Sequence, residues 1–266
     1  MIELIKQQYA SDMSNEDKIN RVREFLQILT LKFIYDKGHF FNIAFVGGTA
    51  LRILYNLRRF SEDLDFSLIN KDKYNFSKLI GEVKKSFEIF NIDIEIKVNE
   101  NKTVHSAFLK FPNLLSDLKL SPFAKQKISV RIEVDTTPPK GFILDTTFIN
   151  KLYIFTVTHF DLSSLYATKL HACFFRKFTK GRDYYDLLWY LSKDIKPNYM
   201  LLNNAIKQTE NLNLKLSDSN FKNFMLEKIR SIDYEVIKKD VDRFLEDKNE
   251  LSLLNLKTFE NIILKI

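Results

Sequence analysis

The sequence predicts an α/β domain with a mixed (α+β) sheet, followed by an all-α helical bundle. Strand-like segments alternate with helical patterns up to about residue 158, and helical periodicity alone follows from residue 160. This order is typical of an α/β unit joined to a helical unit. The 266 residues are enough for two such units. We therefore expect one domain over residues 1–158 and a second over residues 159–266.

The first helix of the predicted α/β domain covers residues 15–36. Ser14 or Asn15 can cap it, and apolar residues recur along it at helical spacing. The clearest strand covers residues 128–135, where apolar and polar side chains alternate before two prolines. Further strands are expected at 40–46, 63–69, 92–98, 103–111 and 152–157, helices at 49–57 and 73–90, and a loop or short helix at 112–126.

Helices alone are expected in the predicted bundle. Pro197 and the polar stretch 211–219 separate neighbouring helices. The apolar spacing places the helices at about 160–177, 182–192, 199–210, 218–230, 234–247 and 253–265.

Composition narrows the class of protein. The net charge of +7 is spread along the chain, which permits nucleotide or RNA binding without demonstrating it. The single cysteine, Cys173, excludes an intrachain disulfide framework and a thiolate zinc cluster. No apolar run approaches the ~20 residues of a membrane span, and the N-terminus lacks the apolar core of a signal peptide. We expect a cytoplasmic protein with no membrane partner.

A glycine pair begins the strongest candidate site. Gly47 and Gly48 lie between a predicted strand and a predicted helix, where the backbone can approach a ligand and aim N–H groups at an anion. The hydroxyl of Thr49 could add a donor. A tight turn explains such a pair more often than a ligand does.

Asp63 and Asp65 are a stronger signal, because alternation places both carboxylates on one strand face. Two negative charges ~4 Å apart repel by ~1 kcal/mol in water and by ~4 kcal/mol at an effective dielectric constant of about 20. A half-buried pair therefore requires a cation, and Mg²⁺ suits carboxylate oxygens together with substrate phosphates. A solvated strand face, or ion pairs with Arg58 and Arg59, explains the two aspartates about equally well.

The spacing of the two elements favours the metal site. A nine-residue helix advances ~13 Å, and the five extended residues after it can return up to ~17 Å. The flanking strands can then run antiparallel, with Asp63 and Asp65 beside Gly47 and Gly48. One pocket would hold phosphate donors and metal ligands together.

A third acid would complete a two-metal site or activate an acceptor hydroxyl. Glu133 can supply it, since it points away from the apolar face of the strand 128–135. Asp135 shares that face and is the alternative. A plain surface strand would explain both residues without any chemistry.

Two sequence blocks, in order, resemble a known family. They are Val46-Gly47-Gly48-Thr49 with Ser61-Glu62-Asp63-Leu64-Asp65-Phe66, and Ala167-Thr168-Lys169-Leu170-His171-Ala172 with Arg176 and Arg182-Asp183-Tyr184-Tyr185-Asp186-Leu187. Together they look like the signature of nucleotidyltransferase-fold proteins, and most like the AbiEii/AbiGii toxin family (DUF1814). Thr49 stands where many nucleotidyltransferases have Ser, and the strand around Glu133 matches the family's third-acid strand loosely.

The resemblance implies a nucleotidyltransferase-like first domain that transfers NMP from an NTP with the help of Mg²⁺ or, alternatively, Mn²⁺. The implied metal ligands are Asp63, Asp65 and Glu133, and the implied nucleotide-binding residues are Gly47, Gly48, Thr49, Lys169, Arg176 and Asp183. Catalysis would also involve Lys169 and Asp186. The acceptor would be an RNA, plausibly a tRNA 3′ end. The protein would be the toxin of a toxin–antitoxin or phage-defence pair, with a cognate antitoxin as its partner.

Other interpretations stay open for the second block and for the function. An interdomain ion-pair network would account for the second block without a substrate, because its charged residues lie on matching helical faces. A catalytically silent module that binds nucleic acid or a partner is one alternative function, and a transferase acting on a protein or small molecule is another. A basic rim for nucleic acid, or a merely solvated surface, could be formed by Arg58, Arg59, Lys177, Lys180 and Arg182.

Overall fold

The computed structural model describes residues 1–123, 125–193 and 195–265. The chain divides into two compact units. The first comprises Met1–Tyr55, Phe60–Pro138 and Thr146–His159, and the second comprises Asn56–Arg59, Pro139–Asp145 and Phe160–Ile266. The second unit thus includes two short segments that a single boundary after residue 158 would assign to the first.

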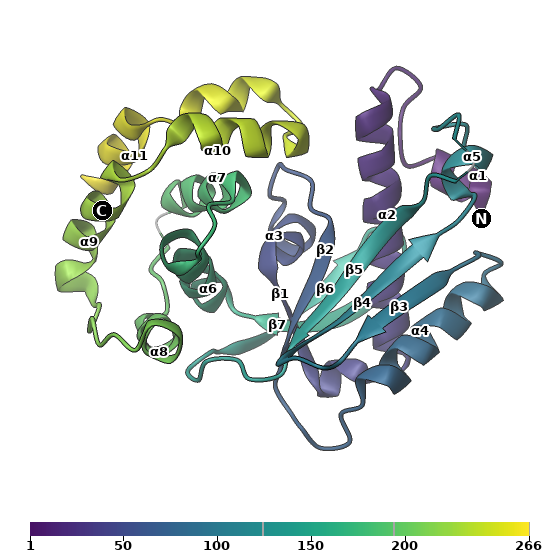
Figure 1. The fold of residues 1–266 in the computed structure, drawn as a ribbon, viewed down its shortest axis with the longest axis horizontal. Coiled ribbons are helices and arrows are strands. Elements are labelled where there is room, and N and C mark those ends of the chain that lie inside the picture. Colours follow the sequence, from purple (N-terminus) through teal and green to yellow (C-terminus); the bar gives the residue numbers. More distant parts are fainter. Residues whose placement is uncertain (124, 194, 266) are drawn as a thin grey trace. The chain divides into compact units, whose positions relative to one another are not determined.

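A mixed sheet of seven strands, in the order β3-β4-β5-β2-β1-β7-β6, organises the first unit (Figure 1). β2 is antiparallel to β1 and parallel to β5, and β1 is parallel to β7. The predicted mixed sheet is therefore confirmed. Its strands are β1 (Ile43–Val46), β2 (Asp63–Leu68), β3 (Glu95–Asn99), β4 (Val104–Phe111), β5 (Ile128–Asp135), β6 (Leu144–Asn150) and β7 (Ile154–Phe160).

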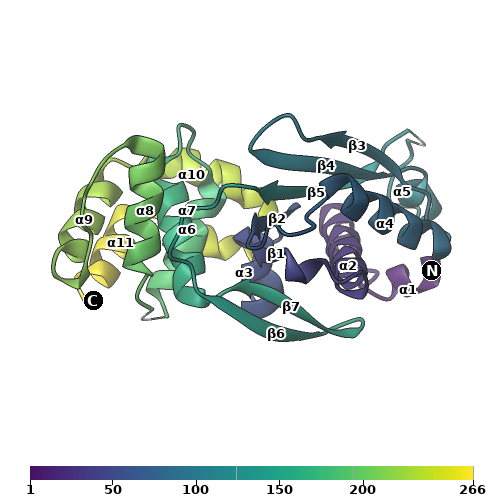
Figure 2. The same ribbon diagram turned by 90° about the horizontal axis from the view of Figure 1, so that it is seen from below.

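Two helices, α2 (Asn15–Asp36) and α4 (Phe76–Ile89), cover one face of this sheet (Figures 1 and 2). The apolar side chains of β2 and β5, such as Leu64 and Ile132, are buried in the core beneath them. Because side chains alternate along a strand, the acidic residues between these apolar positions project from the other face. The predicted acids of the site thus share the sheet face opposite the core.

Helix boundaries in the first unit follow capping chemistry. The side chain of Ser14 accepts a hydrogen bond from the backbone N–H of Asp17, so α2 begins where the sequence indicated. Asn75 caps α4 in the same way, through the N–H of Lys78. The other helices are α1 (Ile2–Lys6), α3 (Gly47–Tyr55) and α5 (Leu114–Asp117).

From Leu162 onward the described elements are helices. They are α6 (Leu162–Phe175), α7 (Gly181–Leu191), α8 (Tyr199–Glu210), α9 (Asp218–Arg230), α10 (Tyr234–Val241) and α11 (Leu256–Ile263), with 3₁₀ segments at Asp242–Phe244 and Lys248–Leu253. In the described parts of the chain, none of the helices has the length and apolar character needed to cross a membrane.

Two expected elements differ in their bounds from the structure, and one observed strand was not expected. The expected strand at 40–46 begins only at Ile43, because His39–Phe41 form a 3₁₀ turn. β6 was not predicted, since its largely exposed side chains give no apolar alternation. The helix expected at 234–247 ends at Val241 and continues as a 3₁₀ turn.

Candidate active site

The glycine turn is built around one close contact. Gly47 has a φ of +78°, and this left-handed conformation lets β1 turn directly into α3. A Cβ atom at Gly47 would lie 2.3 Å from Oδ2 of Asp65 and 2.9 Å from its Cβ. Glycine is therefore required at position 47 for two reasons: the positive φ of the backbone, and the space that the Asp65 carboxylate occupies. Gly48 follows as a buried residue of the first helical turn.

Thr49 ties this helix to the aspartate strand. Its side chain is fully buried, and its hydroxyl donates a hydrogen bond to the main-chain oxygen of Asp63. The hydroxyl that the sequence suggested as a phosphate donor is thus directed at the backbone of β2. Any phosphate contact by Thr49 would have to come from its backbone N–H, which lies in the first turn of α3.

A buried ion pair fixes the other side of α3. The guanidinium of Arg52 donates from Nε and Nη2 to the two carboxylate oxygens of Glu24 on α2, with both distances 3.0 Å. The same guanidinium lies 4.2 Å from the ring centroid of Phe60. Burial opposes ionisation of Glu24, but Arg52 outweighs it and lowers the pKa of this carboxyl group. The helix that follows the glycine turn is therefore held rigidly.

The strand register brings Asp65 to the end of β1 and Glu133 beside Asp65. Val46, at the end of β1, pairs with Asp65, and Asp65 pairs in turn with Glu133 of β5. Asp63 is half-buried and pairs with Arg131. The antiparallel return of the chain is confirmed, and Asp65 lies directly beside Gly47.

Glu133 has a partner that the sequence did not suggest. Its Oε1 lies 2.6 Å from Nη2 of Arg131, two residues earlier on the same strand. Arg131 also lies over the ring of Phe108, with 5.1 Å between the guanidinium carbon and the ring centroid. Glu133 therefore lies beside Asp65 in the sheet, with its charge compensated by an arginine.

Asp135, the alternative third acid, performs a local structural task. Its Oδ1 accepts a hydrogen bond of 2.9 Å from the backbone N–H of Thr137, which shapes the turn after β5. In the sheet it pairs with Ser67, two residues further along than the Asp65–Glu133 pair. Burial raises its pKa. Glu133 is thus the acid next to the aspartates.

The donor set fits a divalent cation in part. Asp63 and Asp65 offer carboxylate oxygens, the ligands that Mg²⁺ prefers, and Gly47 leaves the space above Asp65 without a side chain. In residues 1–123, 125–193 and 195–265, no group of three or more His, Cys, Asp or Glu side chains is arranged to hold a metal ion. Two aspartates are in place, and Glu133 is held by Arg131.

The charged residues of the second block form a chain of buried ion pairs in the second unit. Nζ of Lys169 lies 2.7 Å from Oδ1 of Asp183 and 2.7 Å from Oδ2 of Asp186. Arg59 makes a bidentate contact with Asp186, at 2.5 and 2.6 Å, and Arg176 reaches Oδ2 of Asp183 at 2.7 Å. We call these five residues the Lys169 network.

The charges of the Lys169 network stabilise one another. Burial disfavours the ammonium of Lys169, but the two adjacent carboxylates outweigh this effect and raise its pKa. Burial likewise opposes ionisation of Asp183, while Lys169 and Arg176 lower its pKa. Asp186 is fully buried, whereas the side chain of Arg176 is 39% exposed. The interpretation of this block as an ion-pair network therefore has direct structural support.

Arg59 was considered as an ion-pair partner of Asp63 and Asp65 or as part of a basic rim, but its carboxylate partner is Asp186. Its side chain is buried and engaged by Asp186, since a fully desolvated carboxylate requires a cation beside it. Arg182 stacks on Phe244, with 4.2 Å between its guanidinium carbon and the ring centroid.

Solved structures with this fold are known. JHP933 from Helicobacter pylori matches with a TM-score of 0.55 at 20% identity, over 91% of this chain and 90% of that one. A candidate nucleotidyltransferase from H. pylori matches with a TM-score of 0.57 at 20% identity, over 91% and 93% of the two chains. The fold is thus similar to that of nucleotidyltransferases.

The family is established by sequence. The model of the nucleotidyl transferase AbiEii toxin family, of type IV toxin–antitoxin systems, matches residues 32–263. The chain therefore belongs to this family, and the predicted resemblance is confirmed. No curated protein matches the chain.

Proposed function

We propose that the protein is an NTP-dependent nucleotidyltransferase and the toxin of a toxin–antitoxin pair. The observation that carries the proposal is the contact of Gly47 with Asp65, which joins the start of a helix to a strand bearing two carboxylates on one face. Free N–H groups at a helix start favour anions, and paired carboxylates favour a divalent cation. A nucleoside triphosphate with its metal ion presents both charges.

Each candidate site residue of the first unit has a proposed task. Asp63 and Asp65 would hold Mg²⁺ or Mn²⁺, which would neutralise negative charge on the phosphates when bound. The backbone N–H groups of Gly47, Gly48 and Thr49 would bind phosphate oxygens. Glu133, once released from Arg131, would be the third ligand or the base.

The proposed reaction is an in-line displacement at the α-phosphate. The oxygen of an acceptor hydroxyl forms a bond to the α-phosphorus, and the bond from that phosphorus to the bridging oxygen of the β-phosphate breaks. The hydroxyl proton passes to the carboxylate of Glu133, and pyrophosphate leaves. The contribution of this chain is to position the reactants and to stabilise charge.

Some residues of the Lys169 network would bind the nucleotide, and Asp186 would hold the charged side chains in position. Lys169, Arg176 and Asp183 are the candidate nucleotide-binding residues of this network. The guanidinium side chain of Arg176 is more exposed than the side chain of Lys169. Asp186 was predicted to be catalytic. Because it is fully buried and bound by Arg59 and Lys169, we propose that it positions these cations.

The acceptor proposed is an RNA, with the 3′ end of a tRNA as the first candidate, and the partner proposed is a cognate antitoxin in the cytoplasm. The family description supports a toxin–antitoxin role. The second candidate function is a catalytically silent module that binds nucleic acid or a partner. The Arg131–Glu133 ion pair favours this candidate, because the carboxylate of Glu133 is engaged by an arginine. A transferase acting on a protein or a small molecule would use the same residues.

The test is transfer of label from each α-³²P-labelled NTP to total RNA in the presence of Mg²⁺. Wild type is compared with an Asp63→Asn/Asp65→Asn double variant and with Asp93→Asn, which alters an exposed carboxylate of the same unit. Labelling by wild type and Asp93→Asn, its loss in the double variant or with EDTA, and its recovery with Mg²⁺ or Mn²⁺ are expected.

Other outcomes discriminate between the alternatives. Equal labelling by the double variant would rule out the assigned site. Retention of RNA without labelling would favour the binding module. Label on a protein or a small molecule in RNase-treated extract would favour a different acceptor.

A further inference from the structure

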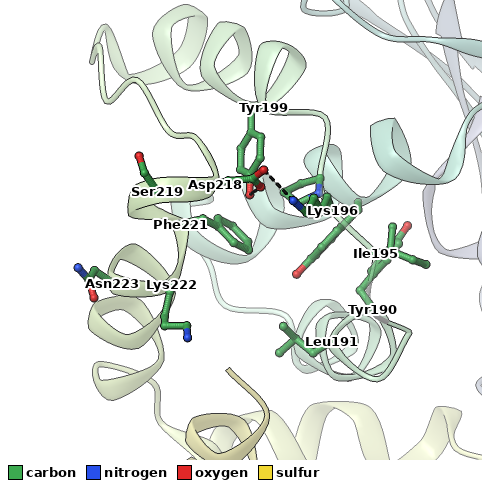
Figure 3. A pocket seen from close by; sticks show the side chains of 12 residues that line it. Tyr190, Leu191, Ile195, Lys196, Tyr199, Asp218, Ser219, Phe221, Lys222 and Asn223 are labelled. Carbon is green, nitrogen blue, oxygen red and sulfur yellow. Dashed lines mark hydrogen bonds and ion pairs between the residues drawn. The ribbon is translucent and has the colours of Figure 1, made fainter. Parts of the chain in front are cut away.

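A cavity of about 450 Å³ lies among helices of the second unit (Figure 3). Its lining comes from α6, α7, the segment before α8, α8 itself and the first turns of α9. The volume falls in the range of ~300–1,000 Å³ that is usual for small-molecule sites. None of the lining residues belongs to the Lys169 network or to the proposed catalytic residues.

The deep wall of this cavity is aromatic. The rings of Tyr166 and Tyr190 are stacked, with centroids 4.3 Å apart and an interplanar angle of 10°. Phe221 meets Tyr166 edge-on, and Tyr199 meets Phe221 at 73° with centroids 5.6 Å apart. Tyr166, Tyr190 and Phe221 are buried, with 1%, 0% and 6% of their surface exposed, so they form the support behind the wall. Tyr199 is half-buried and lines the cavity, so its ring is the one on which a planar ligand can stack, at little cost in side-chain entropy.

The mouth of the cavity is charged. Asp218 lies between Tyr199 and Lys196 (Figure 3), accepting from the hydroxyl of Tyr199 at 3.0 Å and from Nζ of Lys196 at 2.7 Å. The side chains of Lys196 and Asp218 are 75% and 60% exposed. An ammonium has three donors and a carboxylate about four acceptor positions, so both groups can also bind a ligand. Lys222 adds a second cation to the lining.

We propose that this cavity binds a nucleotide unit, with the base against the ring of Tyr199 and the phosphate at Lys196. Aromatic rings accept the π-face of any base, Asp218 can accept from an amino group of the base, and Lys196 can pair with the phosphate. A purely apolar ligand would leave the charged mouth unused, and a sugar phosphate would leave the ring of Tyr199 unused. The nucleotide can be free or can be the end of an RNA strand, since both have the same chemistry.

The test measures binding to the full chain by calorimetry at low salt in EDTA. The probes are the four nucleoside monophosphates, adenosine without a phosphate, ribose 5-phosphate without a base, and a single-stranded tetranucleotide. We expect the monophosphates to bind at least about tenfold more tightly than ribose 5-phosphate, as one stacked base implies. Tighter binding of the tetranucleotide than of the monophosphates would identify an RNA end as the source, and the reverse would identify a free nucleotide.

Variants assign the binding to this cavity. Lys196→Ala should weaken AMP and leave adenosine unchanged, because it removes the phosphate partner. Tyr199→Leu should weaken both ligands by about tenfold, through loss of a stacking ring. Tyr199→Phe keeps the ring and should therefore retain binding of both ligands. This variant can be measured even if Tyr199→Leu does not fold. Lys257→Ala, which alters an exposed lysine outside the cavity, should bind as wild type does.

Three results would overturn the proposal: no nucleotide binding at millimolar concentration, ribose 5-phosphate binding as tightly as AMP, or AMP binding that Lys196→Ala does not change. The proposal goes beyond the proposed catalytic function and does not depend on it. The Asp63→Asn/Asp65→Asn variant should bind AMP in this cavity as wild type does, so the two can fail separately.

Discussion

Gly47 and Asp65 occupy adjoining space, such that a methyl group on Gly47 would lie 2.3 Å from the Asp65 carboxylate. Gly47→Ala should therefore displace this carboxylate, and the positive φ adds strain. Because a misplacement of ~1 Å can cost ~100-fold in rate, label transfer should fall by about 100-fold or more.

The matched control for that variant is Gly81→Ala in α4. An added methyl group there meets nothing within 4 Å, and replacing glycine inside a helix stabilises by up to ~1 kcal/mol. This variant should retain full transfer activity. Wild-type activity in Gly47→Ala would show that the carboxylate position at Asp65 does not matter for the reaction.

Thr49 is expected to act through Asp63. Thr49→Val removes the hydroxyl that holds the main-chain oxygen of Asp63, so it should cost ~1–3 kcal/mol in the free energy of unfolding and also lower kcat. Thr49→Ser should retain both. Thr30→Val in α2 removes another buried hydroxyl, which donates to the main-chain oxygen of Leu26 at 2.7 Å. This variant should lower the free energy of unfolding and leave kcat unchanged. Urea denaturation and kcat together distinguish these cases, and an unchanged kcat in Thr49→Val would refute the positioning role.

Removing one charge from the Lys169 network should destabilise the protein strongly. Asp186→Ala leaves Arg59 buried without its bidentate partner, which typically costs ~3–5 kcal/mol. Glu88→Gln breaks an exposed pair with Lys84 and should change the free energy of unfolding by less than ~1 kcal/mol. Guanidinium denaturation measures both. Similar small effects from the two variants would contradict the assignment of a buried network.

The same network gives a pH dependence. Asp183 has a pKa lowered from 3.8, so its stabilising contribution is present above that value and is lost as the pH falls through the folded-state pKa. Lys169 has a pKa raised from 10.5, so its contribution is present below that value and is lost at more alkaline pH. Asp183→Asn should therefore lose less stability than wild type on acidification below about pH 4. An identical acid decline in both proteins would count against this interpretation.

Sequence patterns predicted those elements of the fold whose bounds depend on neighbouring residues. The cap at Ser14 and the alternation in β5 set those boundaries directly. β6 escaped prediction because its side chains are mostly exposed and carry no apolar alternation. The antiparallel return of the chain from β1 to β2 could be predicted from the lengths of a helix and a loop, because the two lengths match.

The candidate site was less predictable where long-range contacts decide it. Arg59 and Asp186 are separated by 127 positions in the chain, so no local spacing could reveal their contact. The Arg131–Glu133 pair is local, but a strand pattern shows which face two residues share and not whether their side chains meet. The Thr49 hydroxyl looked like a phosphate donor because sequence does not show burial.

The central claim is transfer of a nucleoside monophosphate by the Gly47–Asp65 site, and the position of the label tests it most directly. The protein is incubated with RNA and Mg²⁺ and with the same NTP labelled either at the α-phosphate or at the γ-phosphate, beside the Asp63→Asn/Asp65→Asn variant. We expect α-label on RNA and γ-label in released pyrophosphate, with neither produced by the variant. Transfer of γ-label to the acceptor, or undiminished α-transfer by the variant, would contradict it.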